Sequence, residues 1–343
     1  MKKPKHILVI RLSAMGDVAM TVPVLQAFSQ TYPEVKLTIL SRAFYKPFFE
    51  DIPNVTFLEA DVYGKHKGMG LFELAKEAKS LGIDAVADLH NVIRSKIITK
   101  FLSVSGIKSA TIDKGRKEKK ELTRETNKDF RQLKTTHQRY TDVFSMLGFP
   151  IDLEESKAFS RRDFNQKLQN LVGTEPKKLI GIAPFAAHKS KMYPLDLMKE
   201  VIFELDKTQQ YKILLFGGGK EESSKLKSIA TDFSSVICVV DVLSFKEELA
   251  LISNLDVMLS MDSGNGHLAA MYGVPVISLW GVTHPFAGFA PFGQNPENNI
   301  VSNRTKYPLI PTSIYGNKFP EGYEDAMQTI LQQDVVTKIL EIL

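Results

Sequence analysis

Cysteine is nearly absent from this chain of 343 residues, and long apolar runs are missing. Cys238 is the single cysteine, so a disulfide framework and a cysteine-based zinc site are excluded within one chain. It lies in the apolar run 236–240, which predicts a buried strand residue. No apolar run approaches the roughly 20 residues of a membrane-spanning helix. The composition therefore favours an ordinary globular protein.

A signal-peptide pattern is also missing. Residues 1–6 are basic, but the apolar segment that follows, Ile7–Ile10, is too short for the hydrophobic region of a signal peptide. It leads directly into Arg11 and, soon after, Asp17. We therefore expect the protein to stay in the cytoplasm, where it is made.

Familiar motifs for metals, cofactors and nucleophiles are absent as well. The chain has no D-x-D pair, no H-E-x-x-H, no cluster of histidines and no G-x-S-x-G elbow. The glycine run 217–219 lacks both the G-x-G-x-x-G spacing and the Walker lysine pattern. We therefore expect no metal site and no resident cofactor.

What the chain does have is a regular alternation of strand and helix patterns. Such alternation predicts parallel βαβ units, and hence an α/β fold with two doubly wound parallel-sheet domains. Ligands of these sheets bind at the carboxyl ends of the strands, so we expect a site in a cleft between the domains. The expected strands are at residues 6–11, 35–40, 55–58, 85–89, 179–183, 212–216, 236–240, 257–260 and 276–279.

A polar stretch at residues 150–177 interrupts the alternation and is expected to be the linker. We place the first domain at residues 1–170 and the second at residues 171–325. The final helical pattern, residues 326–343, has an apolar face. We expect this helix to pack back on the first domain.

Asp17 lies where the first strand gives way to a helix, in the segment RLSAMGDV. One interpretation is structural, because an acid at a helix start binds free amides and complements the helix dipole. The other is functional: a general base at the mouth of the cleft. The residues alone leave both open.

A second strand-to-helix turn, MDSGNGHLAA at residues 261–270, combines small residues with a histidine in the first helical turn. Small residues allow a ligand to approach the backbone, and a helix N-terminus favours phosphate. The alternative is a capped helix with a buried histidine. This turn is our best candidate for a ligand site.

Two further loops follow strands of the second domain. Lys191 could meet the negative charge of a departing diphosphate, although Lys189 competes for that role. Glu221 and Glu222 follow the glycine run and could hold ribose hydroxyls, or could simply be an acidic first helical turn.

Basic residues crowd the stretch 114–134, where nine lysines and arginines outnumber four acids. A solvated face is one interpretation. A basic lip for anionic lipid or a phosphorylated acceptor is the other, and it would bring peripheral contact with the inner membrane. Nucleic acid is not expected as a partner, because Phe130 is the only aromatic residue among these charges and no binding motif accompanies them.

Two long segments resemble glycosyltransferase family 9, the bacterial heptosyltransferases of lipopolysaccharide assembly. They are ILVIRLSAMGDVAMTVPVLQAF near the N-terminus and SMDSGNGHLAAMYGVPVISLWGVTHP in the second half. Their order and spacing also fit, so the resemblance covers nearly the whole chain. It implies a GT-B fold, with the acceptor in the N-terminal domain and a nucleotide-sugar donor, typically ADP-heptose, in the C-terminal domain.

The resemblance also implies roles for individual residues. Asp17 takes the position of the catalytic base, and Arg11 that of a basic residue near the acceptor. Contacts to the donor are implied for Lys191, Glu221 or Glu222, Asp262, Ser263, Gly264 and His267. Further acceptor contacts, which no family motif fixes, are proposed for His90, Asn91, Arg94, His137 and Arg139.

The expected reaction is a metal-independent single displacement that inverts the sugar and delivers it to a glycolipid or lipopolysaccharide core. The chain departs from the family at Ala186 and Ala187, where the best-known heptosyltransferases have hydroxyl residues. That difference concerns the identity of the sugar more than the reaction type. The alternatives are a non-catalytic nucleotide-sugar-binding protein and a nucleotide-sugar epimerase of the same fold.

Overall fold

The structure is a computed structural model that describes residues 3–154 and 156–343. The chain forms two compact units. Unit 1 comprises Met1–Gly115 and Lys134–Lys157, and unit 2 comprises Arg116–Leu133 and Ala158–Leu343. The α/β class and the two parallel sheets predicted from the sequence are confirmed. Met1 and Lys2, which begin the basic N-terminus considered as a signal region, lie outside the described residues.

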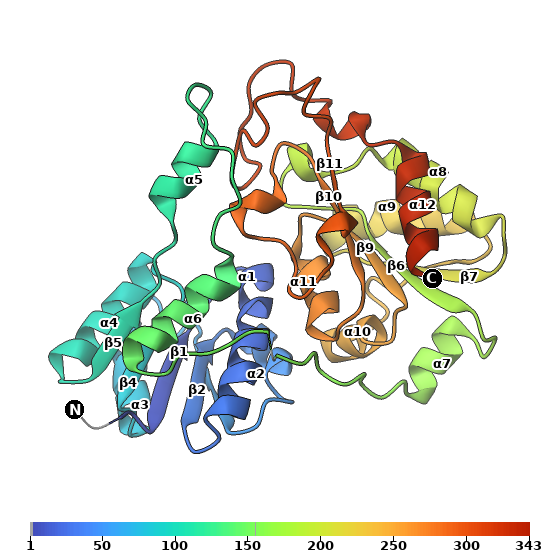
Figure 1. The fold of residues 1–343 in the computed structure, drawn as a ribbon. Helices are drawn as coiled ribbons and strands as arrows, with labels where there is room; N and C mark the ends of the chain where they lie inside the picture. The colour runs from blue at the N-terminus through green and yellow to red at the C-terminus, as the bar shows by residue number, and fades with distance from the viewer. Residues whose placement is uncertain (1–2, 155) are drawn as a thin grey trace. The chain divides into compact units, whose positions relative to one another are not determined.

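Unit 1 is built on a parallel five-stranded sheet in the order β3-β2-β1-β4-β5 (Figure 1). Its strands are β1 (His6–Ile10), β2 (Lys36–Ser41), β3 (Val55–Glu59), β4 (Ala85–Asp88) and β5 (Lys108–Thr111). Its helices are α1 (Met15–Ala19), α2 (Thr21–Thr31), η1 (Ala43–Phe48), α3 (Gly70–Ser80), α4 (Ile93–Val104) and α6 (Thr136–Leu147).

Helices cover both faces of this sheet, which explains why its central strand β1 is buried at every position. On one face, Leu8 and Ile10 of β1 share a core with α3 and α4. On the other, α2 packs against α6, with the rings of Phe28 and Phe144 4.9 Å apart. β1 is therefore packed on both faces, up to the point where the loop leaves its carboxyl end.

Unit 2 contains a parallel six-stranded sheet in the order β11-β10-β9-β6-β7-β8 (Figure 1). Its strands are β6 (Lys178–Ala183), β7 (Tyr211–Leu215), β8 (Val236–Cys238), β9 (Val257–Met261), β10 (Val276–Trp280) and β11 (Asn299–Val301). Its helices are α5 (Arg116–Leu122), α7 (Gln166–Val172), η2 (Lys189–Lys191), α8 (Leu195–Asp206), α9 (Gly219–Thr231), α10 (Phe245–Ile252), α11 (Gly264–Met271), η3 (Pro285–Ala287), η4 (Pro296–Asn298), η5 (Ala326–Thr329) and α12 (Gln332–Ile342).

The C-terminal helix α12 corrects one expectation. The sequence predicted that it packs back on the first domain, whereas it packs on α8 and β9 within unit 2. Val335, Val336 and Ile339 carry its apolar face, and all three are buried in the core of unit 2. The apolar spacing was sufficient to predict an amphipathic helix but carried no information about the surface that it covers.

The chain also passes between the units in a way that the sequence did not predict. The expected boundary lies at residue 170, whereas the contacts place it at residue 157, so α7 belongs to unit 2. Residues 116–133, which include α5, leave unit 1 and join unit 2 before the chain returns. Leu122 and Leu133 anchor this excursion in an apolar cluster with Ala287.

Two smaller expectations can also be assessed. Cys238 does lie in a strand but is only partly buried, because β8 is at the edge of its sheet. Among the described residues, no helix combines the length and the apolar character needed to cross a membrane.

Candidate functional site

Each sheet reverses its strand order at one point, and the candidate residues gather there. In unit 1 the reversal lies between β1 and β4, and in unit 2 between β9 and β6. Loops that leave neighbouring strands at such a point diverge to opposite faces, which opens a crevice for a ligand. Each unit therefore has a candidate site of its own.

In unit 1, Arg11 and Asp17 form an ion pair at the end of β1, with Nη2 and Oδ2 2.5 Å apart. The Arg11 side chain is 7% exposed, whereas that of Asp17 is 30% exposed. Arg11 also donates to the carbonyl of Leu89 at 2.8 Å, which ties it to the loop after β4. The arginine is thus a buried anchor, and the aspartate is the member that solvent or a substrate can reach.

Asp17 lies in the first turn of α1, as the structural interpretation expected. Its Oδ2 accepts a long hydrogen bond of 3.4 Å from the amide of Ala14. The carboxylate therefore contributes to the helix start and remains accessible at the same time, so the two interpretations do not exclude one another.

Tyr140 of α6 stabilises the backbone of this turn, because its hydroxyl donates to the backbone carbonyl of Asp17 at 3.2 Å. Burial raises the pKa of Tyr140, so the phenol stays protonated and remains a donor. Burial lowers the pKa of Arg11, but Tyr140 and Asp17 raise it by more, so the net pKa lies above the ordinary value. The sequence analysis missed Tyr140; its neighbour Arg139 was the candidate.

His90 and Asn91 follow β4 and are held by the buried carboxylate of Asp88. Asp88 Oδ1 accepts from the backbone amides of both residues at 2.9 Å. The Leu12 amide donates to His90 Nδ1 at 3.4 Å, which places His90 against the loop that bears Arg11. Burial and then the charge of Arg11 lower the pKa of His90 to about 3, so this imidazole is neutral at physiological pH.

The remaining acceptor candidates lie at the ends of other elements. Arg94 is exposed at the start of α4, with its guanidinium 5.2 Å from the centre of the Tyr63 ring. His137 and Arg139 are both buried on α6. Arg139 donates to the carbonyl of Asp113 at 3.5 Å. An ion pair joins Arg11 to Asp17 and a hydrogen bond places His90 beside them at Leu12, whereas no described hydrogen bond or ion pair joins Arg94 to Asp17.

In unit 2, the loop after β9 forms the start of α11. Ser263 precedes the helix in an extended conformation, and Gly264 is its first residue. The hydroxyl of Ser260 accepts from the amide of Gly266 at 3.1 Å and lies 3.1 Å from that of Ser263. His267 is buried in the first turn. The glycines keep the start of the helix free of side chains, as an anion site requires.

Lys191, on the loop after β6, forms an ion pair of 2.9 Å with Asp262 on the loop after β9. Thr283, on the loop after β10, donates to the same Asp262 oxygen at 2.9 Å. Gly316 covers the lysine stem so closely that a Cβ there would lie 2.6 Å from it. Loops from three strand ends thus converge on one largely sheltered cation, and Thr283 is a contact that the sequence did not predict.

The two glutamates after β7 behave differently. Glu222 turns back and accepts from the amide of Gly218 at 2.9 Å. Glu221 is 84% exposed and pairs with Lys225 one helical turn further on. The structure therefore favours Glu222 as the residue that faces the loop.

Of the two alanines before Lys191, Ala186 packs on the core of unit 2 and Ala187 is exposed.

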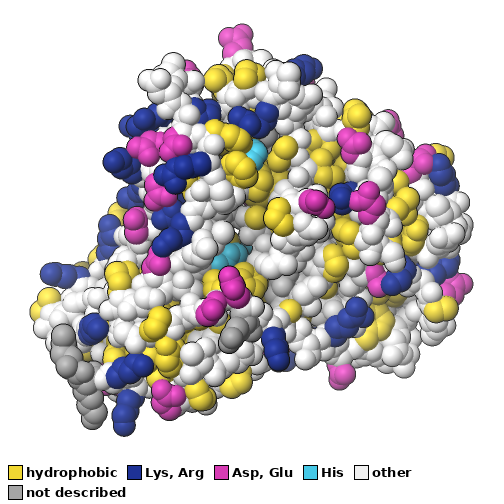
Figure 2. Space-filling view, in the orientation of Figure 1, with side chains coloured by type: hydrophobic (Ala, Val, Ile, Leu, Met, Phe, Trp, Pro, Cys, Tyr) yellow, Lys and Arg dark blue, Asp and Glu magenta, His cyan; other side chains and the backbone are white. Residues whose placement is uncertain are grey.

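The basic stretch is not uniformly solvated. Figure 2 shows basic and acidic side chains interleaved over the region of α5. Lys119 is buried, with its ammonium 4.1 Å from the centre of the Phe289 ring. Lys128 donates to the carbonyls of Leu309 and Pro311, and burial lowers its pKa to about 8. These lysines hold residues 116–133 on unit 2.

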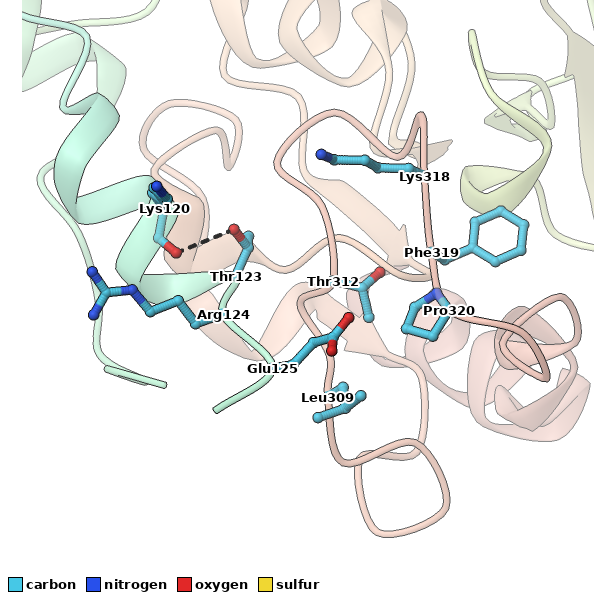
Figure 3. Close-up of a pocket in the computed structure, with 9 residues that line it drawn as sticks. All are labelled: Lys120, Thr123, Arg124, Glu125, Leu309, Thr312, Lys318, Phe319 and Pro320. Atoms are coloured by element: carbon cyan, nitrogen blue, oxygen red, sulfur yellow. Dashed lines mark hydrogen bonds between the residues drawn. The ribbon is translucent and has the colours of Figure 1, made fainter. Parts of the chain in front are cut away.

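Beside α5 lies a pocket of about 380 Å³ (Figure 3). Lys120 and Arg124 line it from α5 and the turn after it, and Lys318 lines it from a loop near the C-terminus. Glu125 is the carboxylate in the lining, so cations predominate. The pocket can take an anionic group.

Residues 71–312 match the family model of glycosyltransferase family 9, the heptosyltransferases. This chain belongs to glycosyltransferase family 9. It is an enzyme of the heptosyltransferase type, and its two parallel-sheet units are those of the GT-B fold.

Relatives of this family member resemble it over most of their length. The lipopolysaccharide core heptosyltransferase OpsX of Haemophilus influenzae is 27% identical over 87% of this chain and 84% of the relative. Lipopolysaccharide heptosyltransferase 1 of Campylobacter coli is 23% identical over 98% of each chain. A family 9 glycosyltransferase structure from Veillonella parvula superposes with a TM-score of 0.77 at 19% identity, covering 100% of this chain and 98% of that chain.

Proposed function

We propose that this protein transfers a heptose, or a related sugar, from an ADP-linked donor to a lipopolysaccharide or lipooligosaccharide core precursor, with inversion and without a metal. Relatives named as lipopolysaccharide and lipooligosaccharide heptosyltransferases support this donor and acceptor class. The observation that carries the mechanism is the accessible carboxylate of Asp17, which is held by buried Arg11 at the strand-order reversal of unit 1.

In the proposed reaction, Asp17 removes the proton of an acceptor hydroxyl as that oxygen attacks the anomeric carbon. The bond from this carbon to the diphosphate oxygen breaks, and the nucleoside diphosphate leaves. Arg11 orients the carboxylate, and Tyr140 fixes the backbone that carries it. A positioned general base of this kind contributes about 10²- to 10⁴-fold to the rate.

Unit 2 is proposed to hold the donor. Lys191, the amides at the start of α11 and His267 lie at the strand ends where a diphosphate would bind. Cations and oriented amides stabilise the charge that builds on a leaving diphosphate. Glu222 is proposed to contact the ribose, because it faces the loop after β7.

Unit 1 is proposed to hold the acceptor through Arg11, His90, Asn91 and Arg94, with His137 and Arg139 nearby on α6. The pocket beside α5 belongs to unit 2 and is proposed separately to bind an acceptor phosphate, because Lys120, Arg124 and Lys318 line it. The acceptor is lipid-linked in this proposal, so a cytoplasmic enzyme would work in peripheral contact with the inner membrane.

The test is a transfer assay with ADP-heptose and a heptose-deficient core acceptor, in the presence of excess chelator. Release of ADP together with a product heavier by one heptose unit is expected. Strict dependence on added magnesium or manganese would contradict the mechanism. ADP-heptose that is bound but never consumed, with all core acceptors, would instead support the binding-protein alternative.

The pocket is tested separately with Lys120→Gln/Arg124→Gln. We expect KM for a phosphorylated acceptor to rise at least about 25-fold, because each of the two cations makes a charge-assisted contact worth about 1 kcal/mol or more, while donor affinity stays unchanged. Lys225→Gln/Lys227→Gln on α9 is the matched control with the same loss of charge. An unchanged acceptor KM would show that the pocket does not hold the acceptor.

A further inference from the structure

The outward face of α4 carries apolar side chains that the core of unit 1 buries only in part or not at all. Ile93 and Val104, at the two ends of the helix, are 79% and 76% exposed. Ile97 and Phe101 lie between them at helical spacing and are only partly buried. These positions recur every three or four residues, so they form one stripe along the helix. The inward positions, such as Ile98 and Leu102, are fully buried.

A groove of about 530 Å³ runs along this stripe. Phe72 of α3 forms its other wall, with its ring 5.8 Å from that of Phe101. Exposed apolar side chains that are scattered singly need no explanation, but a continuous apolar groove marks an interaction surface. We call the residues Ile93, Lys96, Ile97, Lys100, Phe101 and Val104 the α4 face.

Two lysines alternate with the apolar residues of the α4 face. Lys96 and Lys100 are exposed, and both line the groove. Neither lysine has a carboxylate partner among the described residues. By contrast, the exposed Lys199 on α8 forms an ion pair with Asp232. The lining of the groove contains no acidic residue, and the α4 sequence contains none either.

This charge pattern determines what can cover the face. A protein partner would have to supply both an apolar ridge and two carboxylates at one-turn spacing. A membrane with anionic lipid supplies both parts at once, since acyl chains accept the apolar stripe and headgroups accept the ammonium groups. The lysine stems can lie along the apolar surface while their charges reach the headgroups.

We infer that the α4 face docks on a membrane surface that contains anionic lipid. The helix lies in the plane of the interface, with Ile93 and Val104 inserted among the lipids and with Lys96 and Lys100 at headgroup level. This inference rests on the proposed function, because an enzyme that modifies a lipid-linked acceptor meets its substrate more often when it is bound at the membrane. The surface differs from the basic stretch that the sequence suggested for this role.

The experiment is co-flotation of the full chain with vesicles of phosphatidylcholine that contain about one third phosphatidylglycerol, and with vesicles of phosphatidylcholine alone. We expect binding to the anionic vesicles to fall roughly 25-fold in Lys96→Gln/Lys100→Gln, at about 1 kcal/mol per cation. Ile93→Glu/Val104→Glu should reduce binding to the anionic vesicles at least tenfold, because it replaces the two inserted apolar side chains with charges that anionic lipid repels. Both side chains are exposed, so we expect the variant to fold.

Helix α8 offers a matched control. Phe203 is 55% exposed on it, with Lys199 and Lys207 one turn to either side, and both of these lysines are paired with acids. Phe203→Glu and Lys199→Gln/Lys207→Gln should bind anionic vesicles as the unaltered protein does. Circular dichroism and melting temperature confirm that each variant is folded.

Several outcomes overturn the inference. These are no binding of the unaltered protein to anionic vesicles, equal binding by the α4 and α8 variants, and equal binding to neutral vesicles. A dimer in sedimentation that Ile93→Glu/Val104→Glu converts to monomer, without any vesicle binding, would assign the α4 face to a second copy. Transfer to a water-soluble, deacylated core acceptor separates the two proposals: it should survive in the α4 variants, and its absence in the unaltered protein would refute the proposed function alone.

Discussion

Each unit places a cation–carboxylate pair at the point where its strand order reverses, but the two pairs differ in how far the carboxylate is buried. In unit 1 the cation is buried and the carboxylate is accessible, since Arg11 is 7% exposed and Asp17 30% exposed. In unit 2 both partners are sheltered, with Lys191 at 13% and Asp262 at 10%. The first pair leaves its carboxylate accessible, whereas the second shelters both charges.

The supporting contacts follow the same division. In unit 1, Leu89 holds the arginine and Tyr140 holds the backbone of Asp17, while the Asp17 carboxylate has only a long bond of 3.4 Å from the Ala14 amide beside its ion pair. In unit 2, Thr283 donates to Asp262, so the carboxylate is occupied and orients Lys191. We propose that the accessible carboxylate serves proton transfer and that the sheltered pair serves anion binding. The predictions below test this contrast.

The largest effect is expected from Asp17→Asn. The amide cannot accept the acceptor proton, so kcat should fall about 10³-fold. The dissociation constant for ADP should stay within about twofold, because the base acts in the transition state and not in donor binding. Steady-state kinetics and calorimetry give the two quantities. A folded Asp17→Asn protein that loses ADP binding would overturn the assignment of roles.

Lys191→Ala should affect binding and rate together. Loss of a charged contact to the diphosphate costs about 1.5–3 kcal/mol, which weakens ADP binding roughly 10- to 100-fold and also lowers kcat. Exposed Lys189, two residues earlier, is the matched control, and Lys189→Ala should change little.

Asp262→Asn in the Lys191→Ala background should recover part of the lost affinity, because it removes a carboxylate that Lys191 no longer neutralises. If Lys189→Ala reduces ADP affinity more than Lys191→Ala does, the phosphate contact has been assigned to the wrong lysine.

The two supporting hydroxyl groups should give smaller and separable effects. Tyr140→Phe removes the bond to the backbone of Asp17, so kcat should fall a few-fold with ADP affinity unchanged. Thr283→Val removes the bond to Asp262, so ADP affinity should fall a few-fold. Isothermal titration beside initial-rate kinetics distinguishes them. The contrast between the units fails if both variants change the same parameter.

The smallest effect concerns pH and two buried histidines. Burial, and then Arg11, lowers the pKa of His90 to about 3; burial, and then Arg304, lowers that of His284 in unit 2 to about 4. An unfolded histidine has a pKa of about 6.5, so below that pH the unfolded chain binds protons that the folded chain does not. The free energy of unfolding should therefore decrease as pH falls from about 6.5 towards 4.

His90→Gln and His284→Gln should each flatten this dependence. Urea denaturation at several pH values between 6.5 and 4.5 measures it, provided that each variant is folded at pH 7. An unchanged slope in both variants would mean that neither histidine is held neutral by burial.

Much of the architecture follows from local pattern. The β-rich runs at residues 6–11 and 257–260 became β1 and β9, and the small-residue turns after them became the starts of α1 and α11. Parallel strands bring their carboxyl ends to one edge, so Lys191 and Asp262 could be assigned to the same site without a structure. That proximity is confirmed by their ion pair.

The contacts between distant segments did not follow from the sequence. Nothing in the pattern of α12 indicated that it packs on α8, and nothing in residues 116–133 indicated that they join unit 2. An apolar stripe specifies that a face is buried but not which surface covers it. The same limit explains why Tyr140 and Thr283, which are unremarkable in the sequence, were missed.

The sequence by itself determined the α/β class, the two sheets and the polar turns at their strand ends, because periodicity and turn chemistry act over a few residues. The tertiary structure decided how far each member of the two ion pairs is buried, which glutamate after β7 faces its loop and which side of α4 stays exposed. Burial depends on which segments pack together from elsewhere in the chain. That packing leaves Asp17 accessible, keeps His90 neutral and leaves Ile93 and Val104 of the α4 face exposed.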